Sequence, residues 1–330
     1  MLNPYDYGAV GDGLHDDTAA FQAVINRAGE TGESIRVDCG KYLVGELTMR
    51  PQVHITADAT WGFRNSRPGN TILIQKDENQ SCILDMTEAN ACTIDGLSLM
   101  GTGSGGCVGI LSKKTDYGSE EDAYRLENCR VSHFGSHAVF LDHIWCFSVR
   151  HCMFAHSGGD GLRINGWDGF VIDNWFSGNR GAGFGVEGPN ASVTMTGNRI
   201  EWNGAGGIRL EGGSHYNITG NYIDRSGSAG IIMRGTSIAA VTGNIIYRSG
   251  KNEADDPESS NVILERCSGV TFTGNSINVG SDDGGKGDMT PNYAMRLSEL
   301  RDCVVAQNVM YRGGMRRLIH DLGHHINSII

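Results

Sequence analysis

A repeat of 23 residues is the feature that most limits how this chain can fold. Glycines recur at this interval at positions 135, 158, 181, 204, 227 and 250. Inside each repeat, short runs alternate apolar and polar residues, as in "SVTMTG" and "GIRLEG". Strands this short cannot bury a face alone, so consecutive repeats must stack on one another.

A column of polar residues accompanies the glycines. It comprises Asn128, His151, Asn174, Asn198, Asn221, Asn244, Asn275 and Asn308. Asparagines that recur at one corner of stacked coils can hydrogen-bond to one another as a ladder. Glycine corners allow backbone angles that other residues resist. The sequence therefore predicts an all-β fold, a right-handed parallel β-helix of about ten or eleven coils over residues 35–330.

The N-terminal segment has a different period and predicts one helix over about residues 17–28. In "DDTAAFQAVINRAGETG", Asp16 or Asp17 can cap its start, and Gly29 or Gly32 can end it. Apolar residues recur with helical spacing at Phe21, Val24, Ile25 and Ala28. We expect residues 1–34 to cover the end of the coil stack, and residues 1–330 to form one domain.

Charge and cysteine content narrow the class of protein. The net charge of −11 disfavours nucleic acid as a partner, because phosphate binding needs a basic surface. No apolar run approaches the ~20 residues of a membrane span. The nine cysteines show no CxxC spacing, so we expect buried free thiols. No signal peptide precedes "MLNPYDYGAV", which favours the cytoplasm unless a leader has been removed.

The segment "NPYDYGAVGDGLHDDTAAFQAVINRA" resembles the N-terminal signature of the pectate-lyase-like right-handed β-helix superfamily. That superfamily includes polygalacturonase-type glycosidases, polysaccharide lyases, inulin fructotransferases and phage tailspikes. The resemblance implies the β-helix fold and a carbohydrate substrate, and by analogy a homo-oligomer such as a trimer. Because fold alone does not settle function, the reaction must be argued from side chains.

One outward column of the aligned repeats carries charged side chains. It contains Asp142, Asn165, Glu187, Glu211, Arg234 and Glu265. With coils ~4.8 Å apart, Glu187 and Glu211 would hold carboxylates at the ~5 Å separation of retaining glycosidases. Asp142 and Glu187 would suit the wider spacing of inverting enzymes. In a close pair, the pKa of one carboxyl group is raised and that of the other is lowered, as acid–base catalysis requires.

The predicted reaction is therefore glycoside hydrolysis in a groove on this outer face. Glu187 and Glu211 are the leading acid and nucleophile or base, followed by Asp160 and Asp142. Arginines can hold hydroxyl or carboxylate groups, and sugar rings pack on aromatic faces. The predicted substrate-binding residues are Arg163, Arg209, Arg234, His137, His156, Trp167, Trp202 and Glu265. A solvated face of weak ion pairs is the alternative.

Other reactions stay open. "GGDGLRI" resembles the polygalacturonase motif of two adjacent aspartates, with Asp160 at the second position and Gly159 at the first. A lyase needs a base and a group that neutralises a uronate carboxylate, for which the arginines and His133, His137, His143 and His156 are available. Intramolecular fructosyl transfer and a non-enzymatic glycan-binding or tailspike-like protein are further alternatives.

No cofactor and no metal site are expected. Two acidic insertions, residues 251–260 and 280–292, precede strands of the predicted groove and could form its wall. Calcium binding through Asp255, Asp256, Asp282 or Asp283 is one interpretation of their acidity. Plain solvated loops are the other.

Overall fold

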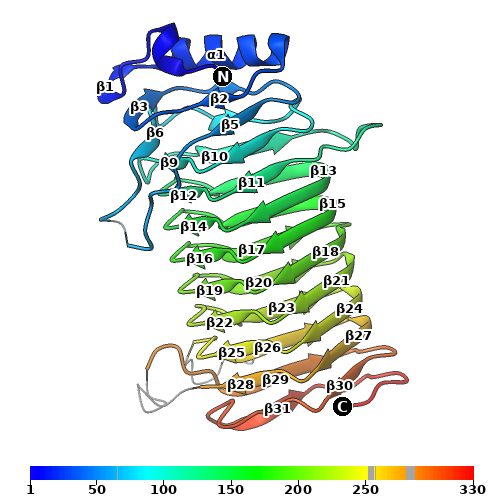
Figure 1. Ribbon diagram of the computed structural model, residues 1–330. Coiled ribbons are helices and arrows are strands. Elements are labelled where there is room, and N and C mark those ends of the chain that lie inside the picture. Colours follow the sequence, from blue (N-terminus) through cyan, green and yellow to red (C-terminus); the bar gives the residue numbers. More distant parts are fainter. Residues whose placement is uncertain (65, 252–255, 257, 280–286) are drawn as a thin grey trace. The chain divides into compact units, whose positions relative to one another are not determined.

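The computed structural model describes residues 1–64, 66–251, 256, 258–279 and 287–330. Its contacts divide the chain into two compact units, Met1–Phe170 and Val171–Ile330. In both units short parallel strands stack coil upon coil, as the repeat predicts (Figure 1). No helix in these described ranges has the length and apolar character needed to cross a membrane.

The first unit begins with a short 3-10 helix and the α-helix. Its elements are η1 Pro4–Tyr7, β1 Asp12–Asp16, α1 Thr18–Thr31, β2 Ile35–Arg36, β3 Gly40–Val44, β4 Leu47–Thr48, β5 His54–Thr56, β6 Thr71–Gln75, β7 Cys82–Asp85, β8 Thr93–Asp95, β9 Ser98–Met100, β10 Val108–Lys113, β11 Arg125–Glu127, β12 Arg130–Ser132, β13 Val139–Arg150, β14 Met153–Ala155 and β15 Leu162–Ile172, whose last two residues belong to the second unit.

The predicted helix is confirmed, with a later end. Its four apolar positions are buried, and α1 lies across the end of the coils of the first unit (Figure 1). Gly32, with φ 72°, terminates it, and Gly29 does not. Asp17 occupies the N-cap position without capping the helix, because its carboxylate accepts hydrogen bonds from the backbone N–H groups of Val10 and Gly11. The side chain therefore fastens the preceding loop.

The second unit repeats one plan of three strands per coil. Its elements are β16 Trp175–Ser177, β17 Ala182–Glu187, β18 Ala191–Thr196, β19 Arg199–Glu201, β20 Gly206–Glu211, β21 Ser214–Thr219, β22 Tyr222–Asp224, β23 Ile231–Arg234, β24 Ser237–Thr242, β25 Ile245–Tyr247, β26 Ser260–Glu265, β27 Ser268–Thr273, β28 Ser276–Asn278, β29 Tyr293–Ser298, β30 Val304–Ala306 and β31 Arg317–Asp321.

The strands form three faces in each unit. In the second unit the first strands are β17, β20, β23, β26, β29 and β31, the second strands are β18, β21, β24, β27 and β30, and the third strands are β16, β19, β22, β25 and β28. In the first unit β7, β10 and the start of β13 are first strands, and β9, β12 and β14 are third strands. Apolar residues point inward from all three faces and form the core.

An asparagine ladder runs through the second unit, which confirms the predicted column there. The side-chain carbonyl of each asparagine accepts from both the backbone N–H and the side-chain amide of the preceding one, at 2.8–3.1 Å. The ladder comprises Asn174, Asn198, Asn221, Asn244, Asn275 and Asn308. It satisfies buried turn groups that would otherwise destabilise every coil.

The column differs in the first unit, where the prediction is wrong by one residue. Asn128 and His151 occupy the left-handed corner itself, at φ 53° and 52°. The ladder position that follows is taken by Cys129 and Cys152, and the Cys129 N–H donates to the Cys152 sulfur at 3.4 Å. Both residues are buried thiols, so they replace asparagine as small hydrogen-bonding groups in the turn.

Candidate active site

The outer face of the first strands in the first unit gathers titratable groups. Phe140 and Asp142 on β13 point outward, since Val139 and Leu141, which alternate with them, are buried. Asp142 lies beside Lys113 of β10 in the register of the strands. This face therefore presents the outward column that the aligned repeats predict.

Asp142 lies at the centre of one group of polar side chains. Its Oδ1 accepts a hydrogen bond from Asn165 Nδ2 at 2.8 Å and lies 2.9 Å from His143 Nδ1. The Tyr117 hydroxyl donates to Asn165 Oδ1 at 3.5 Å. Withdrawal from water raises the pKa of Tyr117, and the Asp142 carboxylate raises it further. The phenol therefore keeps its proton in neutral solution.

An aromatic pair borders this group. Tyr117 stacks on Trp167, with ring centroids 4.7 Å apart and planes inclined by 28°. Tyr117 also packs beside the His143 ring at 5.3 Å. The side chain of Trp167 is 42% exposed, so part of its surface stays open to a ligand. An open aromatic face beside hydrogen-bonding groups suits a sugar ring, which has both apolar and polar surfaces.

Asp160, Arg163 and His137 form a second group on the same unit. Asp160 is 2% exposed, and its Oδ2 accepts from Arg163 Nη1 at 3.2 Å. Its backbone N–H donates to His137 Nδ1 at 2.8 Å, so the proton of a neutral His137 ring lies on Nε2. Asp160 precedes Asn165 by five residues, roughly 15 Å of extended chain. The carboxylates of Asp142 and Asp160 therefore lie too far apart for a glycosidase pair.

A steric contact explains why the residue before Asp160 is a glycine, Gly159. A Cβ at Gly159 would lie 2.7 Å from His137 Nδ1, which is closer than real contacts allow. The aspartate that the polygalacturonase motif places there cannot be accommodated while His137 holds this position.

In the second unit the predicted column is in register. Glu187, Glu211, Arg234 and Glu265 are neighbours on successive first strands β17, β20, β23 and β26. Glu187 is exposed, and Glu211 is partly exposed. The two glutamates are therefore adjacent in the register of β17 and β20.

Arg234 gathers three carboxylates. Its guanidinium binds Glu211 at 3.1 Å, Glu258 at 2.9 Å and Glu265 at 3.2 Å. Burial raises the pKa of Glu265, but hydrogen bonds from Arg296 and Arg234 outweigh this and hold it below its ordinary value. This end of the column is a half-buried ion-pair network, the alternative considered for a charged face.

The other predicted residues of the second unit lie in different settings. Arg209 on β20 is half-buried beside Gly185 in the register, and Gly185 is buried. Ile232, the next outward residue, packs with Ala229 and Ile263 in a buried cluster. The outward positions of Ile232 and Ile263 are therefore buried, whereas Glu211 and Arg234 beside them stay partly exposed.

Two predicted binding residues belong to another corner. Trp202 follows β19 with φ 60°, and His156 follows β14 with φ 55°. β20 separates Trp202 from Glu211, and its five rises correspond to roughly 17 Å. Trp202 therefore lies at the opposite end of β20 from Glu211, and His156 lies at the turn that precedes β15. Their role in substrate binding stays a prediction.

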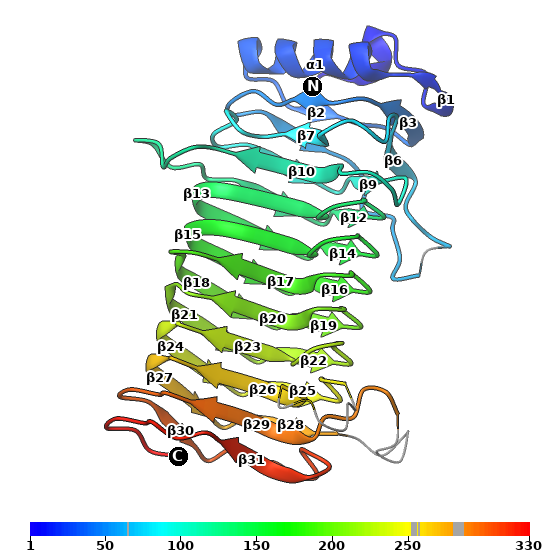
Figure 2. The same ribbon diagram turned by 180° about the vertical axis from the view of Figure 1, so that it is seen from behind.

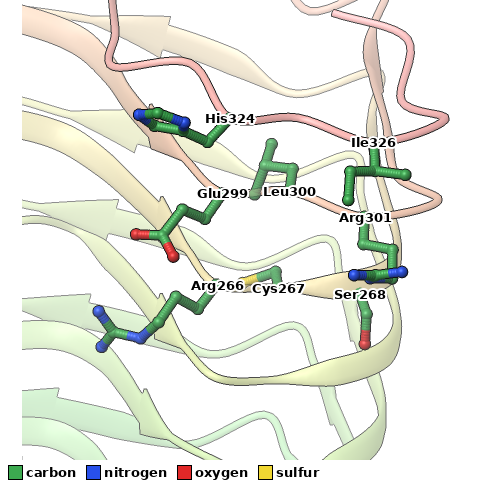
Figure 3. Close-up of a pocket in the computed structure, with 8 residues that line it drawn as sticks. All are labelled: Arg266, Cys267, Ser268, Glu299, Leu300, Arg301, His324 and Ile326. Carbon is green, nitrogen blue, oxygen red and sulfur yellow. The ribbon is translucent and has the colours of Figure 1, made fainter.

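A hollow of about 650 Å³ lies at the corners after β26 and β29 and contains none of the predicted catalytic residues. Figure 3 shows Arg266, Glu299 and His324 on one side of it, and Ser268, Arg301 and Ile326 on the other. These corner residues carry charges of both signs, and Arg266 binds Glu265 at the end of first strand β26.

The acidic insertions fall mostly outside the described residues. Asp255, Asp282 and Asp283 lie there, whereas Asp256 is described and its carboxylate accepts from the Glu258 N–H at 2.8 Å. Within the described part of the chain, no three His, Cys, Asp or Glu side chains are grouped as metal ligands. Calcium binding stays a prediction.

A comparison of the sequence with known protein families identifies the family of this chain. A family described as "Right handed beta helix region" matches residues 137–309, which is more than half of the chain. This chain belongs to the right-handed β-helix family.

Known proteins share this β-helix. The chain is 27% identical over 210 residues to "Depolymerase 1, capsule K30/K69-specific" of Klebsiella phage K5-2, a match that covers 58% of this chain and 25% of the relative. It therefore spans about a quarter of the length of the curated relative it matches.

Solved structures with the same fold come from bacteria and phages. The A-module of the Azotobacter vinelandii mannuronan C-5 epimerase AlgE6 superposes with a TM-score of 0.70 and 17% identity, covering 100% of this chain and 99% of that one. Tailspike protein 2 of the Escherichia coli O157:H7 bacteriophage CAB120 superposes with a TM-score of 0.75 and 15% identity, covering 92% and 42%. At these identities the likeness concerns the β-helix fold alone.

Sequence reasoning missed Tyr117 in this β-helix. It lies between β10 and β11, in a segment that has no place in the 23-residue repeat. A loop insertion on a rigid scaffold was the signal that could have found it. Asn165 and His143 were noted, but their convergence on Asp142 was not.

Proposed function

We propose that this chain is an enzyme that acts on a polysaccharide at the outer face of its first strands. The observation that carries the proposal is the open Trp167 ring stacked on Tyr117, beside Asp142, His143 and Asn165. Aromatic surface next to convergent polar and titratable groups is the usual composition of a carbohydrate-processing site. The similar proteins include a capsule depolymerase and a mannuronan epimerase, which agrees with this proposal.

The first candidate reaction is glycoside hydrolysis by Glu187 and Glu211. Their adjacency in the register favours a carboxylate separation near the ~5–5.5 Å of retaining glycosidases. Arg234 binds Oε1 of Glu211 at 3.1 Å and stabilises its anion, so Glu211 suits the nucleophile. Glu187, exposed at the end of β17, would then protonate the leaving oxygen. Asp160 and Asp142 follow as catalytic candidates.

The second candidate is elimination at the first unit, and a specific set of contacts favours it. Elimination needs a base for the proton beside a carboxylate, a proton donor for the leaving oxygen, and groups that neutralise the carboxylate. His143 can serve as the base and Tyr117 as the donor, because its raised pKa keeps it protonated. Asn165 and Arg163 can hold the substrate carboxylate from the neighbouring strand.

The experiment that tests the function is mass spectrometry of products from a panel of plant, bacterial and fructan polysaccharides. Products whose masses sum to the substrate plus one water establish hydrolysis. Masses that sum to the substrate establish elimination if a product is unsaturated, or internal glycosyl transfer if it is a cyclic anhydride. A chain that leaves every polymer intact and unmodified would sink the proposal and favour a binding or tailspike-like role.

Assembly is a separate proposal. We propose a homotrimer, as the superfamily resemblance implies, and sedimentation equilibrium of the purified chain measures the mass directly. A monomeric mass at micromolar concentration would contradict it.

A further inference from the structure

The third strands of the second unit carry a second patterned surface. β19, β22 and β25 lie side by side in both views of the molecule (Figures 1 and 2). Each strand turns its middle isoleucine into the core, namely Ile200, Ile223 and Ile246. The flanking residues and the corner residue that follows each strand face outward, and we call this surface the third-strand face.

Arginine and aromatic side chains interlock over the third-strand face. Each guanidinium carbon lies over a ring, and two of the three contacts join different coils. The pairs are Arg199 over Tyr222 at 4.0 Å, Arg225 over Trp202 at 4.6 Å, and Arg248 over Tyr247 at 3.9 Å.

Two buried carboxylates fix these arginines. Asp224, with 3% of its side chain exposed, accepts from Arg225 at 2.7 Å and from Arg248 at 2.9 Å. Glu201, at 8%, accepts from Arg199 at 2.9 Å. Side chains held in this way lose little conformational freedom when a ligand arrives, so binding is less costly.

The corner residues after these strands have left-handed backbone angles. They are Trp202 at φ 60°, Arg225 at φ 51° and Arg248 at φ 48°. Glycine would adopt these angles without strain, as Gly197, Gly220 and Gly243 do at the corner before the same strands. The turn itself therefore does not require these large side chains.

We propose that the third-strand face binds an anionic polysaccharide chain, separately from the reacting site. Its three guanidinium groups outnumber its two carboxylates, in a protein whose net charge is −11. Arg199 and Arg225 are partly exposed and can meet a ligand, whereas Arg248 is buried and supports the face from beneath. Trp202, 52% exposed, gives sugar rings an apolar surface, and the coil spacing is similar to the length of one sugar in an extended chain. Guanidinium groups pair well with carboxylates along such a chain.

The same pairing recurs two coils further on. Val309 bridges to Ser276, which brings Tyr311 and Arg312 into line with the third strands. Arg312, at φ 46°, lies 5.5 Å over the Tyr311 ring, and Tyr311 is 64% exposed. A further arginine–aromatic pair therefore lies on the line of the third strands, two coils beyond Arg248.

The test is affinity electrophoresis of the full chain through native gels that contain alginate or, separately, dextran. Alginate should retard the wild-type chain and dextran should not. Trp202→Gly should bind alginate about tenfold more weakly, since one aromatic contact is lost. Its free energy of unfolding should not fall, because glycine relieves the left-handed corner. Trp202→Phe keeps a ring and should keep most of the retardation.

A matched control is Ile238→Gly. Ile238 is also exposed and left-handed, at φ 50°, but lies on β24 of the second-strand face. This variant should gain similar stability and bind alginate as the wild type does. The proposal is overturned if alginate does not retard the wild type, if dextran retards it equally, or if Trp202→Gly binds normally. A Trp202→Gly that loses stability together with binding, or that only changes self-association, overturns it as well.

Retardation needs no turnover, so this outcome is distinct from that of the proposed reaction. A chain that binds alginate but alters no polymer would leave this inference standing and remove the enzyme proposal. A chain that cleaves polymers while Trp202→Gly binds normally would do the reverse.

Discussion

Replacing Tyr117 by Phe deletes one oxygen atom and tests elimination directly. If the phenol protonates the leaving oxygen, kcat should fall by roughly 10²–10⁴-fold. The substrate KM should change little, because the stack on Trp167 is kept. Release of unsaturated product, followed by ultraviolet absorbance, measures both. Tyr7→Phe makes the same chemical change at an exposed tyrosine of the N-terminal cap and should be silent. An unchanged kcat in Tyr117→Phe would assign the donor elsewhere.

The single substitutions Glu187→Gln and Glu211→Gln test hydrolysis. Each keeps the shape of the side chain but removes a carboxylate, so each should abolish turnover if the pair reacts, while the circular dichroism stays unchanged. Glu258→Gln is the matched control. It removes another carboxylate of Arg234 without touching the pair, and its kcat should stay near wild type. Full activity in both glutamine variants of the pair would reject this site.

At the scale of elements, the asparagine ladder should behave as a stabilising device. Asn221→Ala removes the acceptor of the Asn198 backbone N–H and side-chain amide and leaves both groups buried. We expect a loss of about 1–3 kcal/mol in the free energy of unfolding, measured by urea denaturation. Asn217→Ala, at an exposed position of β21 in the same coil, should cost much less. Equal losses would mean that the ladder adds nothing specific.

The sequence predicts these elements well wherever its period is regular. Aligning the repeats and setting aside the insertion at 251–260 predicts the strand register from Glu187 to Glu265, because the coils there share one plan of strands. It fails by one residue at Asn128 and His151, since an asparagine or a histidine can occupy the left-handed corner itself as glycine does elsewhere. A polar residue near a turn is therefore an ambiguous marker of register.

The site was less predictable than the fold, for a physical reason. Tyr117 reaches Asn165 and Trp167 from an irregular loop, and no period can place such a residue. The position of Trp202 at a left-handed corner was equally hard to predict, because one residue decides on which side of a sharp turn a side chain lies. Periodicity describes the scaffold, whereas chemistry depends on where the chain departs from it.

For the whole molecule, pH should change stability in two stages. Burial lowers the pKa of His133 below its ordinary value of 6.5, and repulsion by His156 and Arg130 lowers it further. The unfolded chain therefore takes up this proton first, and the free energy of unfolding falls as pH drops through 6.5. The backbone N–H groups of His15 and Leu14 lower the pKa of Asp12 to about 2, and hydrogen bonds from Lys76 and Thr18 do the same for Asp16. Their contribution is lost between 3.8 and about 2.

Thermal unfolding between ~pH 8 and ~pH 3 should therefore show a first decline carried by the first unit and a second at strongly acid pH. His133→Gln removes a titrating group and should flatten the first decline, while Asp16→Asn should weaken only the second. Hydrogen exchange of β12 and β14, which flank the two histidines, should accelerate between pH 7 and 5 in the wild type. Because the two stages belong to different groups, each variant is the control for the other. A stability that is constant down to pH 5 would show that His133 protonates equally in the folded and unfolded chains.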